Sequence, residues 1–393
     1  MKRKYKILCI ILAVLFIAAA AMAYISVPDT LVLYKDSAWE KENIGFKIMD
    51  LDGSIEVSGT AIVPRRLGEY SASLSVFGIQ KPITLRVLEE KEVIPGGETI
   101  GIRLYSDGLV VLGVGKINGE DRSPAEKAGI ASGDVIVSIN GEKVSSPEKF
   151  SQEIARSDNA RIKVKRGSEF LEFDVVPEKS EYDGVKRIGL WVRDSTAGVG
   201  TLTFIDPETG VYGALGHSVS DTDTGVRFEV LEGSIERCGI SAVRKSSKGA
   251  PGELEGIFYK NAENLGDIQK NTVAGIFGSI KKAEGERCKV ALKNEIEEGP
   301  AVIRTSIDGE SVEEYTIEIL RVSQRGKNPS KALTIAVTDE RLIEKTGGIV
   351  QGMSGSPIIQ NGKFVGAVTH VLVNDPTKGY GVLAETMLEN AVS

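Results

Sequence analysis

The segment from Ser123 to Gly141 constrains the fold more than any other part of this chain. It opens on Ser123-Pro-Ala-Glu126, a capping box with proline at the first helical position, which predicts a short helix ending at Gly129. The apolar run Val135–Ile139 predicts a strand, and Asn140-Gly141 predicts the tight turn that follows it. Helix, strand and turn in this order indicate a small mixed unit with its own core.

The flanking residues extend this unit to residues 98–182. Ser146-Pro147 predicts a second helix with Phe150 and Ile154 on one face, and strands are expected over 160–164 and 170–175. The string Ser-Pro-Ala-x-x-Ala-Gly-Ile-x-x-Gly-Asp-x-Ile-x-x-Ile-Asn-Gly resembles the PDZ domains of bacterial proteases. Such domains bind peptides by adding a strand to an exposed sheet edge. The resemblance implies that the peptide-binding loop and strand consist of Asp107, Gly108, Leu109, Val110 and Val111. The alternative is that the whole PDZ-like unit is only a spacer.

The N-terminus predicts export. Four cations, the last of them Lys6, precede an uncharged apolar run from Ile7 to Ile25. A basic flank stays in the cytoplasm, so a signal anchor or transmembrane segment over residues 1–27 places the rest of the chain outside it. Ala21-Met22-Ala23 offers a cleavage site, so removal of the leader is the alternative to membrane anchoring.

Composition favours a mainly β chain with some α structure. The chain is 41% hydrophobic, has 44 glycines and carries a formal net charge of −7. No basic tract follows the leader, which excludes nucleic acid as an expected partner. Cys9 lies in the apolar N-terminal run, which leaves two other cysteines. Cys238 and Cys288 either form one disulfide or are two buried small side chains, and neither has metal-ligand spacing.

Two further regions flank the PDZ-like unit. Residues 28–95 read as a small β-rich domain, with Asp52-Gly53 as a hairpin turn and Pro95-Gly96-Gly97 as a linker after it. Residues 185–393 are rich in strands and glycine, with helical periodicity only at Glu385–Ala391, and we expect a chymotrypsin-like β-barrel there.

Gly352-Met-Ser-Gly-Ser-Pro357 resembles the nucleophile loop of chymotrypsin-like serine proteases. Glycines allow such a turn to expose a hydroxyl and to aim backbone N–H groups at one point. We therefore expect Ser354 to be the nucleophile, with the amides of Gly352 and Ser354 as the oxyanion hole. Ser356 is the neighbouring alternative nucleophile.

A serine hydroxyl needs a general base, and the chain has two histidines. His217 lies in the glycine-flanked turn Gly213–Ser218, before Ser354 in the chain, and is the expected base. His370 lies in a predicted strand behind the nucleophile loop, where a channel wall or a structural role is expected. For the orienting acid we favour Asp339, which gives the order His, Asp, Ser, over Asp221 and Asp223 or a mere turn aspartate.

Nearly the whole chain resembles the SpoIVB peptidase family. The resemblance rests on Gly213-Ala-Leu-Gly-His217, Asn271–Gly278, Val337-Thr-Asp339 and Gly347–Pro357, together with a PDZ-like unit that precedes the peptidase. It implies an exported serine endopeptidase without metal or cofactor, whose site residues are His217, Asp339 and Ser354. It also implies export from the forespore to the space between the spore membranes, and membrane association through the N-terminal segment.

The same resemblance implies the protein's partners. The enzyme would cleave itself and a membrane-bound inhibitor like stage IV sporulation protein FA, so that an intramembrane metalloprotease can activate a late sigma factor. Two alternatives are an HtrA-like envelope protease of broad specificity and a non-catalytic PDZ scaffold. The sequence leaves open the cleavage motif and the oligomeric state.

Overall fold

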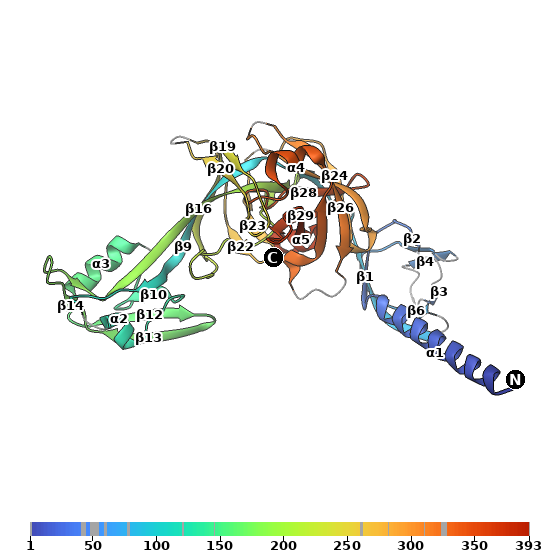
Figure 1. Ribbon diagram of the computed structural model, residues 1–393, viewed down its shortest axis with the longest axis horizontal. Helices are drawn as coiled ribbons and strands as arrows, with labels where there is room; N and C mark the ends of the chain where they lie inside the picture. The colour runs from blue at the N-terminus through green and yellow to red at the C-terminus, as the bar shows by residue number, and fades with distance from the viewer. Residues whose placement is uncertain are drawn as a thin grey trace. The chain divides into compact units, whose positions relative to one another are not determined.

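The computed structural model describes residues 2–40, 45–47, 55–58, 61–76, 79–119, 122–144, 146–259, 262–281, 283–309, 311–323 and 328–392 (Figure 1). The chain divides into two units, Met1–Glu92 with Lys289–Glu297, and Val93–Cys288 with Glu298–Ser393. The predicted turn at Asp52-Gly53 lies outside the described residues.

The first unit begins with the apolar helix α1 (Lys2–Ser26). Its stretch Tyr5–Met22 is long and apolar enough to cross a membrane, and no other helix among the described residues is. Two small sheets and a 3-10 turn follow, with the bounds β1 (Thr30–Tyr34), β2 (Trp39–Glu40), β3 (Gly45–Lys47), β4 (Ile55–Ser58), β5 (Ala61–Pro64), β6 (Gly68–Val76), β7 (Ile79–Leu88) and η1 (Lys293–Glu295). The sheets run in the orders β1-β7-β6-β3 and β2-β5-β4, and their apolar faces form one core that includes Leu31, Ile62 and Leu85.

The PDZ part of the second unit lies between two long strands, β9 (Thr99–Val114) and β16 (Leu190–Ile205). Its other elements are α2 (Pro124–Ala128), β10 (Val135–Ile139), β11 (Glu142–Lys143), α3 (Pro147–Arg156), β12 (Ala160–Arg166), β13 (Glu169–Val175), β14 (Glu178–Lys179) and β15 (Lys186–Arg187). They enclose a core of their own that includes Val111, Ile136, Phe150 and Ile162.

The local predictions for this part are confirmed. The Ser123 hydroxyl accepts a hydrogen bond from the Glu126 amide (3.2 Å), and Gly129 ends α2 in the left-handed region at φ 100°. Asn140 and Gly141 form the turn after β10 with φ values of 52° and 86°. Capping and turn chemistry act over a few residues, so they can be read without knowledge of the tertiary fold.

The remaining strands form the barrel part of the second unit. A closed ring runs β25-β26-β27-β30-β29-β28 and back to β25, with the bounds β25 (Gly299–Thr305), β26 (Glu313–Val322), β27 (Leu333–Val337), β28 (Pro357–Gln360), β29 (Lys363–Val371) and β30 (Lys378–Leu383). A second group of strands packs around Ile102, Phe228 and Ile276. The other strands of this part are β8 (Glu92–Pro95), β17 (Val211–Ala214), β18 (Val230–Arg237), β19 (Gly239–Arg244), β20 (Glu253–Ile257), β21 (Asn264–Asp267), β22 (Lys270–Thr272) and β23 (Gly275–Ser279). A further strand, β24 (Cys288–Val290), begins at the last residue before the chain enters the first unit again. The mainly β fold with a barrel is therefore confirmed.

Three short helices complete the barrel part: η2 (Pro329–Lys331), α4 (Glu340–Thr346) and α5 (Ala384–Val392). The last confirms the C-terminal helix expected from periodicity. The two candidate partners for a disulfide, Cys238 and Cys288, do not form one in the described structure.

Pro95-Gly96-Gly97 is not the linker that its composition predicts. The amides of Gly96 and Gly97 donate to the carbonyl oxygens of Thr203 and Leu202 at 2.9 Å, and all three residues are buried. The glycines are needed for close packing, since a Cβ on Gly96 would lie 2.3 Å from the Leu202 carbonyl oxygen.

The strands β9 and β16 belong to both parts of the second unit. They pair antiparallel from Leu190↔Val114 to Thr201↔Thr99, with two bulges on the way. The end of the pair around Val111 and Val192 contributes to the PDZ core. The opposite end, around Ile102 and Leu202, contributes to the barrel core. Residues 100–106, which the sequence assigned to the PDZ unit, accordingly pair with barrel strand β18.

Candidate active site

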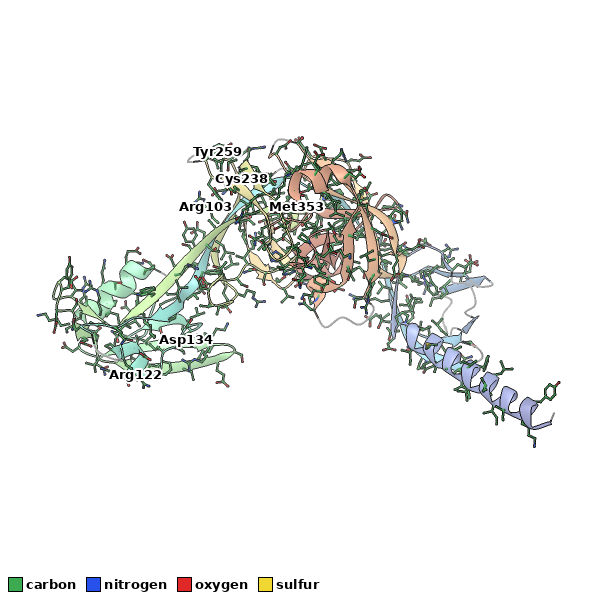
Figure 2. The ribbon with its side chains drawn as sticks, viewed as in Figure 1. Arg103, Arg122, Asp134, Cys238, Tyr259 and Met353 are labelled. Atoms are coloured by element: carbon green, nitrogen blue, oxygen red, sulfur yellow. The ribbon has the colours of Figure 1, made fainter. Side chains whose placement is uncertain are left out.

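The loop that carries Ser354 connects α4 to β28. Gly352 and Gly355 both have φ values of 98°, and Met353 between them is fully buried in the barrel part (Figure 2). A Cβ on Gly355 would lie 2.2 Å from the Thr201 carbonyl oxygen and 2.6 Å from the Leu215 amide nitrogen. Only glycine fits at this position, and the loop is thereby pressed against the segment that leads to His217.

The Ser354 hydroxyl is half-buried and donates to the carbonyl oxygen of Thr369 at 2.6 Å. The alternative nucleophile, Ser356, is fully buried and its hydroxyl donates to the Met353 carbonyl oxygen at 2.7 Å. Ser354 is therefore the hydroxyl of this loop that a substrate can reach.

The amides of Gly352 and Ser354 have no hydrogen-bond acceptor among the described residues, whereas the amides of Met353, Gly355 and Ser356 donate to carbonyl oxygens within the protein. The two amides predicted to form the oxyanion hole are thus the two that the loop leaves unused. Amides at residue i and residue i−2 around a nucleophile are suited to receive a developing oxyanion.

His217 follows β17 in a turn with two successive left-handed residues, Leu215 (φ 69°) and Gly216 (φ 70°). A Cβ on Gly216 would lie 3.0 Å from the Thr369 side chain and 3.5 Å from the Val368 carbonyl oxygen. The turn therefore packs against the end of β29, where the Ser354 hydroxyl also bonds.

The Nδ1 atom of the His217 ring lies 2.9 Å from the carbonyl oxygen of Ser218. Since a carbonyl oxygen only accepts, Nδ1 carries the proton and Nε2 is left as the acceptor. Burial lowers the pKa of His217 below its ordinary value of 6.5, so the ring is neutral at neutral pH. A neutral ring with an unprotonated Nε2 is the form that a general base requires.

His370 lies beside His217, with ring centroids 4.8 Å apart. The limited solvation of the ring, together with His217 and Lys331, lowers the pKa of His370 to about 4. His370 follows Thr369 directly, so both histidines and the Ser354 hydroxyl meet at the end of β29. The Ser354 hydroxyl does not hydrogen-bond to the His217 ring in the described structure, because it donates its proton to the Thr369 carbonyl oxygen and leaves Nε2 of His217 without this donor.

Asp339 is not brought to His217. It is the N-cap of α4, accepts from the Arg341 amide at 3.0 Å and from the Thr316 amide at 3.3 Å, and forms a bidentate ion pair with Arg341. The hydrogen bonds from Arg341 lower the pKa of Asp339, so its carboxylate is ionised.

The two alternative acids are engaged as well. Asp221 is buried, pairs with Arg193 and accepts from the amides of Asp223 and Thr224. Asp223 pairs with the same arginine at 3.1 Å. The partner that the structure gives Nδ1 of His217 is therefore a backbone carbonyl group, which residue types alone could not reveal.

The PDZ residues expected to form an open edge are paired on both sides. Leu109 and Val110 pair with β10, Val110 and Val111 pair with β16, and all three side chains are fully buried. Asp107 donates its amide to the Glu229 carbonyl oxygen, and Gly108, within β9, has a positive φ of 129°. The expected open edge at Leu109–Val111 is thus contradicted, because β9 is a central strand.

The open edge of this sheet belongs to β16 instead. Between Leu190 and Ser195 that strand pairs with β9 on one side, and no described strand pairs with the other. Trp191 on this edge is 71% exposed. The sequence signal that we missed is Gly189, whose left-handed φ of 72° directly precedes the strand.

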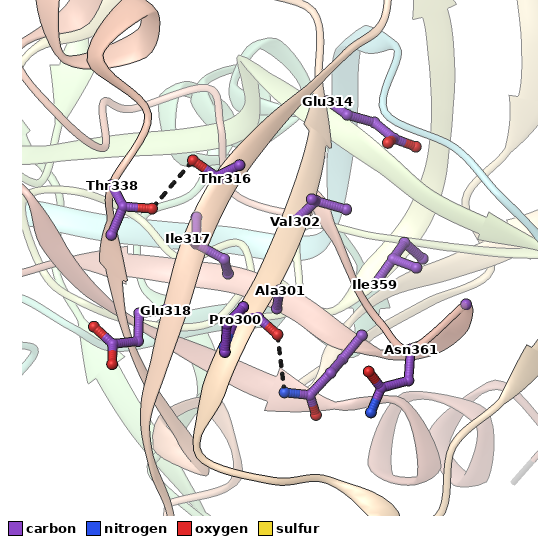
Figure 3. Close-up of a pocket in the computed structure, with 12 residues that line it drawn as sticks. Pro300, Ala301, Val302, Glu314, Thr316, Ile317, Glu318, Thr338, Ile359 and Asn361 are labelled. Carbon is purple, nitrogen blue, oxygen red and sulfur yellow. Dashed lines mark hydrogen bonds between the residues drawn. The ribbon is translucent and has the colours of Figure 1, made fainter.

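A pocket on the barrel surface is separate from these residues (Figure 3). It is lined by β25, β26 and β28 and carries Glu314, Thr316 and Glu318, with Thr338 donating to the Thr316 hydroxyl at 3.1 Å. It contains neither histidine nor Ser354, so it is not the site of nucleophilic chemistry.

Comparison with protein families finds two matches. Residues 184–388 match the model described as SpoIVB peptidase S55, and residues 118–166 match a PDZ domain. The first match spans more than half of the chain and contains both histidines, Asp339 and Ser354.

Curated relatives include a probable periplasmic serine endoprotease DegP-like of Bartonella henselae, 28% identical over 205 residues, which is 44% of this chain and 40% of that protein. Serine protease HTRA1 of Xenopus laevis is 35% identical over 60 residues, or 15% of this chain and 13% of that protein. The chain thus spans less than half the length of these relatives.

Among solved structures, the inactive form of the Rv3671c protease matches with 14% identity and a TM-score of 0.30, covering 50% of this chain and 85% of that one. A PDZ domain of an SdrC-like protein from Listeria monocytogenes matches with 26% identity and a TM-score of 0.19, covering 22% of this chain and 87% of that one.

Proposed function

The chain belongs to the SpoIVB peptidase S55 family, a family of serine peptidases, and on that premise we propose that it is an exported serine endopeptidase with Ser354 as nucleophile and His217 as general base. One observation carries the proposal. The loop of Ser354 leaves the amides of Gly352 and Ser354 without acceptors, next to a histidine whose Nε2 is unprotonated.

The reaction that this geometry supports is acyl transfer. When substrate binds, the Ser354 hydroxyl rotates from the Thr369 carbonyl oxygen toward Nε2 of His217, which takes its proton as Oγ attacks the scissile carbonyl carbon. The oxyanion is stabilised by the amides of Gly352 and Ser354. His217 then returns the proton to the leaving amine, and water hydrolyses the acyl-enzyme with His217 again as base.

For Asp339 we propose an indirect role. Its carboxylate caps α4, and α4 leads through Gly347 directly into the nucleophile loop. The Ser218 carbonyl oxygen takes the place beside Nδ1 that an aspartate occupies in Ser-His-Asp triads. Asp339 would then set the position of the loop, and not the tautomer of the base.

The PDZ part would bind an extended segment of the substrate at the open edge of β16, by main-chain hydrogen bonding. As family membership suggests, we propose two substrates. One is the chain itself, and the other is a membrane-bound regulator resembling stage IV sporulation protein FA, whose cleavage lets an intramembrane metalloprotease activate a late sigma factor. Helix α1 would hold the enzyme at the membrane, in the space between the forespore membranes.

The test uses the full-length chain in detergent beside its Ser354→Ala variant, with new N-termini mapped by mass spectrometry. We expect new N-termini in the parent sample alone. Identical maps from the two proteins would refute self-cleavage by Ser354.

The match to DegP-like endoproteases favours one second candidate, an envelope protease of broad specificity. Such an enzyme would degrade unfolded casein into many fragments. The proposed regulatory enzyme would leave casein largely intact while it cleaves itself at a few positions.

A further inference from the structure

Thr201 makes three hydrogen bonds that connect the two catalytic loops. The residue lies on β16 and is fully buried. Its hydroxyl donates to the Gly352 carbonyl oxygen at 2.8 Å, and its amide donates to the Ser354 carbonyl oxygen at 2.9 Å. Its own carbonyl oxygen accepts from the Leu215 amide at 3.3 Å, two residues before His217.

The two carbonyl groups that Thr201 holds belong to the two residues whose amides are free. Gly352 and Ser354 are each fixed at the carbonyl end by Thr201, while their N–H groups remain unpaired. Gly352 has no side chain that could fix the orientation of its backbone. Its φ of 98° lies in a region where glycine has wide conformational freedom. The Thr201 hydroxyl holds the peptide unit that joins Gly352 to Met353, whereas the Gly352 N–H belongs to the preceding unit, whose Gln351 carbonyl oxygen accepts from the Leu254 amide at 2.8 Å. Without the Thr201 bond, the backbone after Gly352 could rotate and change the spacing between the two free amides.

We infer that Thr201 is a positioning residue of the oxyanion site, and that its hydroxyl holds the Gly352–Met353 peptide unit and thereby the spacing between the amides of Gly352 and Ser354. The inference rests on the proposed function, because it concerns the reactivity of Ser354. It adds a residue outside both catalytic loops, on the strand that also carries the open PDZ edge.

The hydroxyl group can be tested apart from the backbone. The Thr201 amide and carbonyl bonds survive a side-chain substitution, so Thr201→Val removes only the bond to Gly352 while it keeps the β-branched shape. Thr201→Ser keeps the hydroxyl and removes a methyl group. Both variants keep the strand pairing of β16.

The chain offers a matched control two residues away. Thr203 is also fully buried on β16, and its hydroxyl has no hydrogen-bond partner among the described residues. Thr203→Val is therefore the same chemical change on the same strand without loss of a hydrogen bond, and we expect the stability of the protein to stay equal or rise.

The experiment measures covalent labelling of the full-length chain in detergent by a fluorophosphonate probe at a series of concentrations. Ser354 Oγ forms a bond to phosphorus, the phosphorus–fluorine bond breaks, fluoride leaves and the hydroxyl proton passes to His217. The phosphoryl oxygen needs the same amides as the oxyanion. The maximal labelling rate therefore reports on their placement, while the half-saturating concentration reports on probe binding.

Deleting an oxyanion donor costs about 10²- to 10³-fold in rate, so misplacing one should cost less, about 10- to 100-fold in the maximal labelling rate of Thr201→Val. We expect an unchanged half-saturating concentration, and rates close to the parent for Thr201→Ser and Thr203→Val. Equal labelling of Thr201→Val and the parent would overturn this inference and leave the proposed function standing. A parent chain that is labelled no faster than Ser354→Ala would overturn both.

Discussion

The two ends of β16 differ in what surrounds them. Between Leu190 and Ser195 the strand has one paired edge and one open edge, and Trp191 is largely exposed. Between Thr201 and Ile205 it is buried and pairs with β17 as well as β8 or β9. One strand thus leaves main-chain groups unpaired at one end and holds the loops that carry Ser354 and His217 at the other.

Pairing, and not strand identity, therefore decides what a backbone group can do. An N–H group on an open edge is available to a peptide, whereas a paired one serves the scaffold. At the other end of β16 the same rule holds for the nucleophile loop: the amides of Gly352 and Ser354, which we propose as the oxyanion hole, are those that no described acceptor pairs.

The largest expected effect separates catalysis from binding. Ser354→Ala should lower the rate of peptide-bond cleavage by about 10⁶-fold, the usual cost of losing a triad serine. Circular dichroism should match the parent, because the hydroxyl of Ser354 bonds only to the Thr369 carbonyl oxygen. Cleavage by the folded variant at the parental rate would remove Ser354 from the mechanism.

The second prediction compares the central strand with its edge neighbour. Val110→Ala, at a fully buried position, should lower the free energy of unfolding by about 2 kcal/mol through lost burial and a small cavity. Trp191→Ala, on the exposed edge, should change it by no more than about 0.5 kcal/mol. Denaturant unfolding measures both, and similar losses in the two variants would contradict the assignment of the open edge to β16.

The third prediction concerns Asp339 and needs two substitutions. Asparagine is also a good N-cap, so Asp339→Asn should keep α4 in place and lower kcat by less than about tenfold. Asp339→Ala loses the cap and the contact with Arg341, and its activity should be lower than that of the asparagine variant. A loss of about 10⁴-fold in Asp339→Asn would instead identify a triad acid, since that is the cost known for such a change.

The smallest effect on activity is expected from a change of pH, and it concerns His217 at the barrel end of the comparison. His217 acts as base when neutral, and burial lowers its pKa, so activity should persist below pH 6.5 and fall only as pH drops through the lowered pKa. At pH 5.5 an unperturbed histidine would lose about tenfold in neutral fraction, and the enzyme should lose less.

A control for this experiment follows from linkage. The unfolded chain binds a proton at His217 at a higher pH than the folded chain does, so stability also decreases as pH falls below 6.5. Circular dichroism at each pH separates unfolding from titration. An acid limb at or above pH 6.5 in folded protein would refute the role of His217 burial.

What the sequence could predict was local. The cap at Ser123, the Asn140-Gly141 turn and the glycine pattern around Ser354 act within a few residues, and each is found in the structure. Their chemistry depends on backbone angles that neighbouring residue types determine.

What it could not predict was pairing between distant segments. Nothing in Leu109–Val111 indicates that residues near Val192 cover one side of it, because strand register depends on the whole sheet. Chain order suggested Asp339 as the partner of His217, but Arg341 lies two residues away and takes its carboxylate. The composition of Pro95-Gly96-Gly97 predicted a linker. The prediction failed because composition does not reveal that these glycines are needed for close packing.

The shared strand pair also makes the PDZ part an insertion. The chain leaves the barrel along β9 and returns along β16, so the entire PDZ part occupies the position of a hairpin turn between these two strands. Tyr105 and Ser195 face each other across the ribbon just before the two parts separate. Joining Ser106 to Asp194 through a short turn would excise the module and keep the barrel register, whereas a cut at either boundary alone would leave an unpaired strand. Removal of this module therefore requires two junctions, one in each strand, whereas a domain at the end of a chain needs only one.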